Sequence, residues 1–246
     1  MAVVCTILGS MKTHPVKIWR SVLTSVALAL LASTALAVGA IDKLTTSEQT
    51  SGLKTALTQA AQAAIGQLGQ SDGFLGNPEV RIPLPGKLEK AQRMLEMLGL
   101  NKQSDELITA MNRAAEAAVP AAKGLFVDAI KQMSVTDAVG ILTGGEDSAT
   151  QYFRTTMTEK LTARFLPIVG RETSKVELSQ RYNEVAGKLS QFGLIDSQDA
   201  ELDSYVTHKA LDGLFLVMAK EEAAIRKDPL GQSSSILKKV FGALGR

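Results

Sequence analysis

A strongly apolar helical pattern occupies the range Asp203–Asp228. Its apolar residues recur at helical spacing and spread beyond one face of a helix: Val206, Ala210, Leu211, Leu214, Phe215, Val217, Met218 and Ile225. A helix that is apolar over more than half of its circumference is usually surrounded by other helices. The same stretch also carries ionisable side chains, namely His208, Asp212, Glu221 and Glu222. The predicted centre of the fold therefore contains ionisable groups.

Periodic apolar positions predict helices along most of the chain. The predicted helices cover residues 41–70, 87–98, 105–133, 134–143, 148–169, 172–192, 197–228 and 233–244. The predicted N-terminal caps are Ser47-Glu48, Ser104, Ser134 with Asp137 as a capping box, and Ser197. Pro120 is expected to kink or divide its helix, and Pro167 to loosen the end of its own. Gly99 with Asn101, Gly193 and Asp228-Pro229 are the predicted helix ends.

Residues 71–85 interrupt the helical pattern. Residues 71–78, S-D-G-F-L-G-N-P, have the composition of turns, and residues 79–85, E-V-R-I-P-L-P, alternate and contain two prolines. Two prolines favour an extended segment outside any central strand. The sequence thus predicts an all-α fold: a single-domain bundle of about seven to eight helices over residues 41–246, with one short extended segment near residues 79–85.

The N-terminal residues have the order of a secretory signal peptide. From Met11, a basic segment M-K-T-H-P-V-K-I-W-R is followed by the apolar S-V-L-T-S-V-A-L-A-L-L-A-S-T and the small-x-small A-L-A. Cleavage is expected after Ala37, or after Ala40, with residues 1–10 upstream of the true start. An uncleaved membrane anchor is the alternative. The signal predicts a periplasmic protein of a bacterium.

Removing residues 1–37 changes the charge balance. The segment contains Lys12, Lys17 and Arg20 but no acid, so 27 basic residues become 24 against 25 acidic ones, and the net charge changes from +2 to −1. Without a basic excess, nucleic acid is not a predicted partner. The one cysteine, Cys5, also leaves, so the processed chain is expected to rely on its hydrophobic core rather than on disulfides. Lys238-Lys239 predict at most a weak membrane contact.

Metal and nucleophilic catalysis have little support in the sequence. His208 and Asp212, four residues apart, would present two ligands on one helical face. His208 is the one imidazole after residue 37, however, and no further ligands follow at suitable spacing. The same shortage and the lack of a G-x-S-x-G turn argue against Ser-His-Asp chemistry. We expect no metal and no cofactor, and favour either a structural hydrogen bond or partial exposure for His208.

Polar residues of several predicted helices form a candidate pocket. The candidates are Asn112, Arg113, Glu116, Tyr152, Arg154, His208, Asp212, Glu221 and Glu222. One hypothesis is a carboxylate cluster in a polar pocket; the other is an interhelical ion-pair network or a surface array, because buried charges must be paired. Glu222 and Arg226, four residues apart, are interpreted as a surface pair at a helix end.

Several phrases of the chain resemble one bacterial family. They are G-L (52–53) with A-L (56–57), D-G-F (72–74), I-P-L-P (82–85), M-N-R-A-A-E (111–116), A-T-Q-Y-F-R (149–154), K-A-L-D-G-L-F (209–215), E-E-A-A-I-R-K-D-P (221–229) and L-K-K-V-F-G (237–242). Together they resemble domain of unknown function 4197 over roughly residues 50–243. The resemblance implies an exported, mostly helical protein, and it implies no catalytic residue, cofactor or substrate.

The function that the sequence favours is a non-enzymatic exported protein that binds a small amphiphile or a protein. The groove for this partner is expected between the helix at 105–133 and the helix that contains Asp203–Asp228. Two alternatives stay open. One is a hydrolase or lyase that uses the carboxylate cluster as general acid and base. The other is an oligomeric envelope scaffold.

Overall fold

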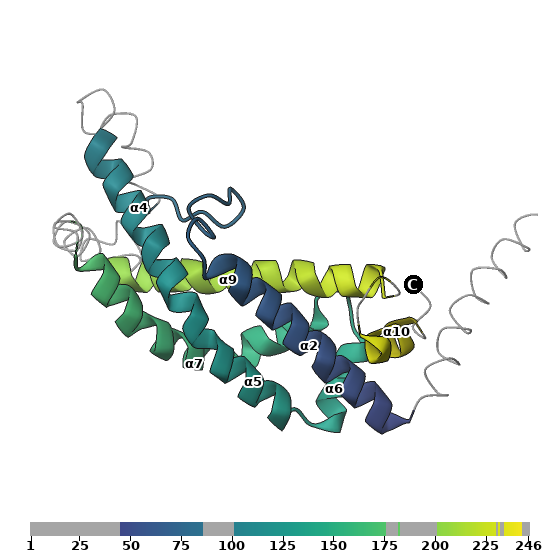
Figure 1. Cartoon of the computed structure of the whole chain (residues 1–246). Helices are drawn as coiled ribbons and strands as arrows, with labels where there is room; N and C mark the ends of the chain where they lie inside the picture. Colours follow the sequence, from purple (N-terminus) through teal and green to yellow (C-terminus); the bar gives the residue numbers. More distant parts are fainter. Residues whose placement is uncertain are drawn as a thin grey trace, which may run out of the picture.

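A computed structural model describes residues 45–85, 101–175, 182, 201–229, 231 and 234–242 (Figure 1). The helices are α2 (Thr46–Leu68), α4 (Asn101–Ala118), the 3-10 turn η1 (Val119–Ala121), α5 (Ala122–Gln132), α6 (Val135–Thr143), α7 (Ser148–Thr173), α9 (Leu202–Lys227) and α10 (Ser235–Gly242). No strand occurs in these residues. The predicted all-α class is confirmed. The predicted signal peptide, the helix at 87–98 and nearly all of the helix at 172–192 lie outside the described residues.

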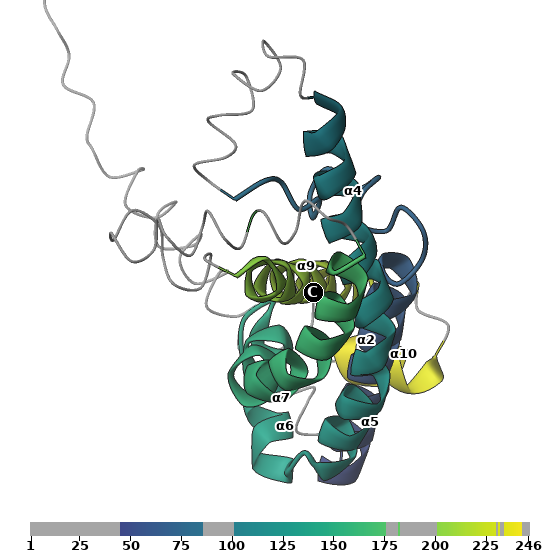
Figure 2. The same ribbon diagram turned by 90° about the vertical axis from the view of Figure 1, so that its left-hand side faces the viewer.

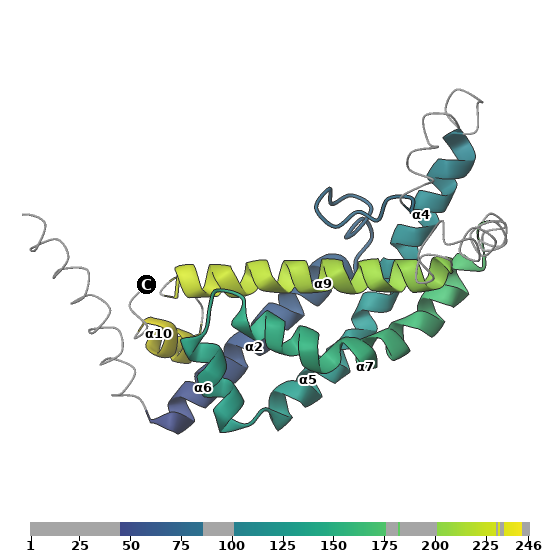
Figure 3. The same ribbon diagram turned by 180° about the vertical axis from the view of Figure 1, so that it is seen from behind.

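Helices α9 and α2 together contact every other described helix. Helix α9 contacts α7, α2 and α4, and Figure 2 shows it nearly end-on, with α5, α6 and α7 below it and α4 rising above it. Seen from behind, it crosses the whole bundle above α7 (Figure 3). Its buried residues extend around much of its circumference, as the apolar pattern predicted. The helix ends at Lys227, before Asp228-Pro229, as predicted.

Helices α4 and α5 form one bent rod. Pro120 lies at its bend inside η1, so the predicted division at this proline is confirmed. Before the bend, Ala114, Ala115 and Ala118 are fully buried, and α4 packs on α7 and α9 there. Because alanine side chains are small, they allow the backbones to approach closely.

The structure corrects three predicted helix starts. Helix α9 begins at Leu202, with Glu201 as its N-cap, and not at the predicted cap Ser197. The N-cap of α2 is Thr45 and not Ser47: the Thr45 hydroxyl accepts from the Glu48 amide, and the Glu48 carboxylate accepts from the Thr45 amide. Ser47 lies inside the first turn of the helix, so it cannot take the cap position. Helix α4 already includes Asn101, so Ser104 is an interior, buried residue and not a cap. The predicted box of Ser134 with Asp137 is confirmed.

Helix α7 continues past Pro167, where the sequence predicted a loosened end. Pro167 is exposed, and the helix runs on to Thr173. A proline inside a helix costs about 3 kcal/mol. Beyond it, Val169 and Thr173 are almost fully buried. Burial of this last turn against the bundle offsets the proline, so tertiary packing overrides the local breaker.

Residues 69–85 cross the bundle without regular secondary structure beyond turns. Ile82 and Leu84 point into the core, which agrees with the predicted extended segment. Phe74 is fully buried and lies against Gly213 of α9, where a Cβ atom would be 2.7 Å from its ring. A glycine at this position lets the aromatic ring pack directly on the helix backbone.

Candidate functional site

The predicted polar residues lie in separate places on the bundle. One group, Asn112, Arg113 and Glu116 of α4, faces residues 71–82. Elsewhere, Arg154 pairs with Asp212. Glu222 of α9 contacts the start of α7. Glu116 and Glu222 have no partner in common among the described residues. Glu116, Asp212 and Glu222 therefore do not face one common pocket.

Asn112 holds the extended segment onto α4. Its Oδ1 accepts from the Ile82 amide at 2.8 Å, and its Nδ2 donates to the Ile82 carbonyl at 2.9 Å and to the Ile108 carbonyl at 2.7 Å. The side chain is fully buried. In this arrangement one amide side chain takes the place of a neighbouring strand, because it satisfies both backbone groups of Ile82.

Glu116 holds the turn that precedes this segment. Its Oε1 accepts from the amides of Phe74 and Leu75 at 3.0 and 3.1 Å, and its Oε2 accepts from Arg113 at 2.7 Å. Arg113 also binds Asp72 at 2.8 Å. The hydrogen bond to Glu116, followed by that to Asp72, raises the pKa of the Arg113 guanidinium. These residues fasten the D-G-F turn to α4, which is a structural role.

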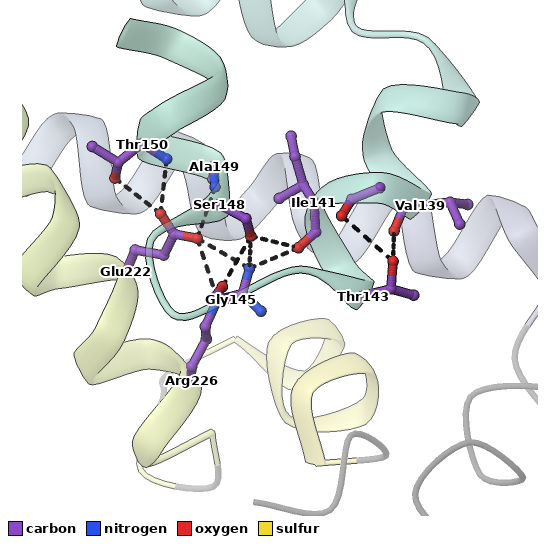
Figure 4. Close-up of polar contacts among 10 residues, drawn as sticks. Val139, Ile141, Thr143, Gly145, Ser148, Ala149, Thr150, Glu222 and Arg226 are labelled. Atoms are coloured by element: carbon purple, nitrogen blue, oxygen red, sulfur yellow. Dashed lines mark hydrogen bonds and ion pairs between the residues drawn. The ribbon is translucent and has the colours of Figure 1, made fainter.

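Glu222 caps the N-terminus of α7 from another helix (Figure 4). Its carboxylate accepts from the amides of Ala149 and Thr150 at 3.0 and 2.9 Å, and from the Thr150 hydroxyl at 2.9 Å. The residue at the local N-cap position, Asp147, makes no side-chain cap bond. The first amides of a helix have no intrahelical partner and favour negative charge. Glu222 supplies both the acceptor and the charge.

Arg226 binds near the C-terminal end of another helix, α6. Its guanidinium donates to the Ile141 carbonyl near the end of α6 at 2.9 Å, to the Ser148 hydroxyl at 3.0 Å and to Glu222 at 3.0 Å. It also lies 5.7 Å from the ring centre of Phe241 in α10. Glu222 and Arg226 are only 6% and 5% exposed. The prediction of a surface pair is therefore wrong, since other helices cover this side of α9.

The other candidates lie closer to solvent. Arg154 and Asp212 form an exposed pair at 3.2 Å, with Arg154 4.8 Å from the ring centre of Phe215. Tyr152 is half-buried, and its hydroxyl lies 3.5 Å from the Asp137 carboxylate. Burial first, and the nearby Asp137 charge second, raise the pKa of Tyr152. Within the described part of the chain, no hydrogen bond joins His208 or Glu221 to another candidate.

The arrangement limits the chemistry available to these groups. Glu116 and Glu222 are each engaged by two backbone amides and an arginine. A carboxylate whose oxygens already accept these hydrogen bonds has no free approach for a substrate. The described residues contain no group of three metal-ligating side chains. His208 and Asp212 therefore lack a third described ligand.

An open groove of about 900 Å³ lies along α2, where α2 meets α5 and the start of α6. Figure 1 shows these three elements together at the lower edge of the molecule. Helix α2 contributes a row of hydroxyl side chains: Thr46, Ser47, Thr50, Ser51, Thr55 and Thr58. Lys54 of α2 and Lys131 of α5 add positive charge, and Ile130 and Val135 add apolar surface.

The sequence patterns do not predict this groove. The predicted groove lies between α4–α5 and α9, but α4 and α9 pack directly on each other. The signal that was available is the polar face of α2, where hydroxyl residues recur at helical spacing opposite the buried leucines and alanines. A polar face of this kind usually faces solvent. Because it lies beside α5 and α6, it forms one wall of the groove.

Of three comparisons with known proteins, one finds a match. Residues 43–242 match the family model described as "Protein of unknown function (DUF4197)". The chain belongs to this family. The suspected membership, based on phrases such as M-N-R-A-A-E and K-A-L-D-G-L-F, is confirmed. Comparisons with curated proteins and with solved structures find no match. Among the described helices of this DUF4197 protein, none is long and apolar enough to cross a membrane.

Proposed function

We propose that this DUF4197 protein is a non-enzymatic binding protein of the bacterial periplasm. Its proposed binding site is the groove along α2, where α2 meets α5 and the start of α6, which we call the α2–α5 groove. The observation that carries the proposal is the groove itself. Its volume of about 900 Å³ lies within the range of small-molecule sites. Its wall combines hydrogen-bonding side chains with apolar surface.

The roles of the polar residues support binding over catalysis. The candidate acids Glu116 and Glu222 fasten backbone segments to one another, and Asp212 forms an exposed ion pair. A general acid or base needs a carboxyl group within reach of a substrate proton. No acid stands among the described residues that line the groove. The described lining of the groove therefore offers recognition without a carboxyl group for proton transfer.

Native mass spectrometry of the protein purified from its own cells tests the proposal. We expect an additional mass that persists under gentle ionisation and disappears on denaturation, because a bound molecule is held non-covalently. A bare monomer at every protein concentration would contradict the proposal. A bare oligomer would favour the scaffold alternative instead.

The proposed location rests on the N-terminal segment and needs its own test. N-terminal sequencing of the purified protein is expected to begin at Val38, or at Ile41 if the second small-x-small site is used. A chain that retains residues 11–37 in the membrane fraction would contradict export by cleavage.

A further inference from the structure

We infer that the α2–α5 groove binds an anionic amphiphile, with the acidic head group at Lys54 and Lys131 and the alkyl chain along the start of α6. The inference rests on the proposed function and names its ligand class. Three properties of the groove lead to it: the sign of its charge, the fixed position of one ammonium group, and the apolar character of one wall.

The charge of the groove is positive. Lys54 and Lys131 line it, and no Asp or Glu does among the described residues. The acids at the starts of α2 and α6 are already engaged: Glu48 binds Lys239, and Asp137 binds Ser134. A head group that enters the groove thus meets two ammonium donors and several hydroxyls. Carboxylates and phosphates bind such donors through charge-assisted hydrogen bonds.

One ammonium group is held in place by the fold. Lys54 donates to the backbone carbonyl of Lys131 at 3.0 Å, in the last turn of α5. An ammonium has three donors, so two others are available for a ligand. Because Lys54 is already positioned by α5, less side-chain entropy is lost when an anion binds. The bond also places the Lys54 ammonium beside the backbone of Lys131, whose side chain lines the same groove.

The start of α6 adds apolar surface to the groove. Val135 is 51% exposed, and Val139, one turn further on α6, is 39% exposed. Large apolar side chains this exposed need no explanation singly, but here one of them lines a groove. On the facing wall, Thr50 contributes to the lining while its Oγ1 is buried. Thr50 therefore presents carbon to the groove, and the surface along α2 is less polar than its composition indicates.

Isothermal titration with dodecanoate, kept below its critical micelle concentration, tests the inference on the full purified protein. We expect saturable 1:1 binding. Dodecyl phosphate should bind similarly, since its head group has the same charge-assisted chemistry. Dodecyltrimethylammonium, which has the same chain and the opposite charge, should bind at least tenfold more weakly. Equal affinity for the anion and the cation would overturn the inference.

Groove variants locate the site. Lys54→Gln and Lys131→Gln should each weaken dodecanoate binding about tenfold, which is the effect expected for one charge-assisted contact. Val135→Asp should weaken it at least as much, by adding a negative charge to the apolar wall. Lys160→Gln, an exposed change on α7, is the matched control and should leave binding unchanged. Unchanged affinity in all three groove variants would overturn the assignment.

The two proposals fail in different ways. If dodecanoate does not bind but native mass spectrometry retains a different molecule or a protein, the ligand class is wrong and the binding function stands. If dodecanoate does not bind and native mass spectrometry shows a bare monomer, both are wrong.

Discussion

Glu222 and Arg226 lie one turn apart on α9, and together they bind the facing ends of two other helices. Glu222 accepts from the first amides of α7, and Arg226 donates to the Ile141 carbonyl near the end of α6. Each charge has the sign that its helix end favours. The pair therefore fixes the turn between α6 and α7 onto α9. Because both side chains are buried, each charge needs the other as its counter-charge.

Replacement of Glu222 by alanine should strongly destabilise the fold. We expect a loss of about 3–5 kcal/mol in the free energy of unfolding, because Arg226 would remain buried without its counter-charge. Urea denaturation monitored by circular dichroism measures the change. Asp212→Ala, which breaks an exposed pair, is the matched control and should lose less than about 1 kcal/mol.

The double change Glu222→Leu with Arg226→Leu separates pairing from capping. If the main penalty of Glu222→Ala is the unpaired arginine, the double variant should be more stable than that single variant. A double variant no more stable than Glu222→Ala would show instead that capping of α7 is the dominant contribution.

Two buried threonines should respond to valine in opposite directions. The Thr207 hydroxyl is buried and has no hydrogen-bond partner among the described residues, so Thr207→Val should raise the free energy of unfolding by about 1 kcal/mol. The Thr150 hydroxyl donates to Glu222, so Thr150→Val should lower it by about 1–3 kcal/mol, since this acceptor is charged. Thermal and urea unfolding of both variants provide the test; a loss of stability in Thr207→Val would contradict the first expectation.

Replacement of two helical glycines by alanine should change the stability in opposite directions. In Gly213→Ala the new methyl would lie 2.7 Å from the Phe74 ring and 3.2 Å from Val80, and overpacking of this kind costs about 1–3 kcal/mol. Gly66 is exposed in α2 and has open space around it. Gly66→Ala should therefore stabilise the protein by about 0.5–1 kcal/mol through helix propensity. Equal effects of the two changes on the urea midpoint would contradict the close contact between α9 and Phe74.

The packing of α10 on α2 should weaken at acid pH, because it depends on the charge of Glu48. Hydrogen bonds from Lys239 and from Thr45 lower the pKa of the Glu48 carboxyl to about 2. A carboxyl with a lowered pKa contributes stability above its unfolded value near 4.5, and this contribution is lost as the pH falls toward 2. Glu48→Gln should thus be less stable than the natural protein at pH 5, and the difference should shrink as the pH approaches 2. Glu159→Gln, exposed on α7, is the control; a difference independent of pH would contradict the role of the charge.

The fold class and most helices could be predicted because they depend on local patterns. The capping box at Ser134, the division at Pro120 and the apolar circumference of α9 are readable within a few residues of sequence. Pro167 does not end its helix, because burial of the following turn overrides the local breaker. Ser104 is not a cap, because the helix already includes Asn101, three residues earlier.

The partners of the polar residues could not be predicted in the same way. Glu222 binds amides more than seventy residues earlier in the chain, and spacing alone indicated only its neighbour Arg226. Likewise, Asn112 and Glu116 were recognised as polar positions in an alanine-rich helix, but their partners are backbone groups of the 71–82 segment. The groove along α2 depends on how three helices meet, so no single stretch of sequence encodes it.

The position of α10 has a consequence for how the chain reaches its native state. Gly52, near the start of the described chain, packs so closely against Val240 that an added Cβ atom would lie 2.4 Å from the valine side chain. Lys239 pairs with Glu48 across 191 residues of sequence. Contacts of such separation form late, because a long loop must close before they add stability. Helix α10 thus covers the Arg226 side chain and the first described helix, α2. The core around Arg226 is therefore complete only after α10 has been synthesised and has docked on α2.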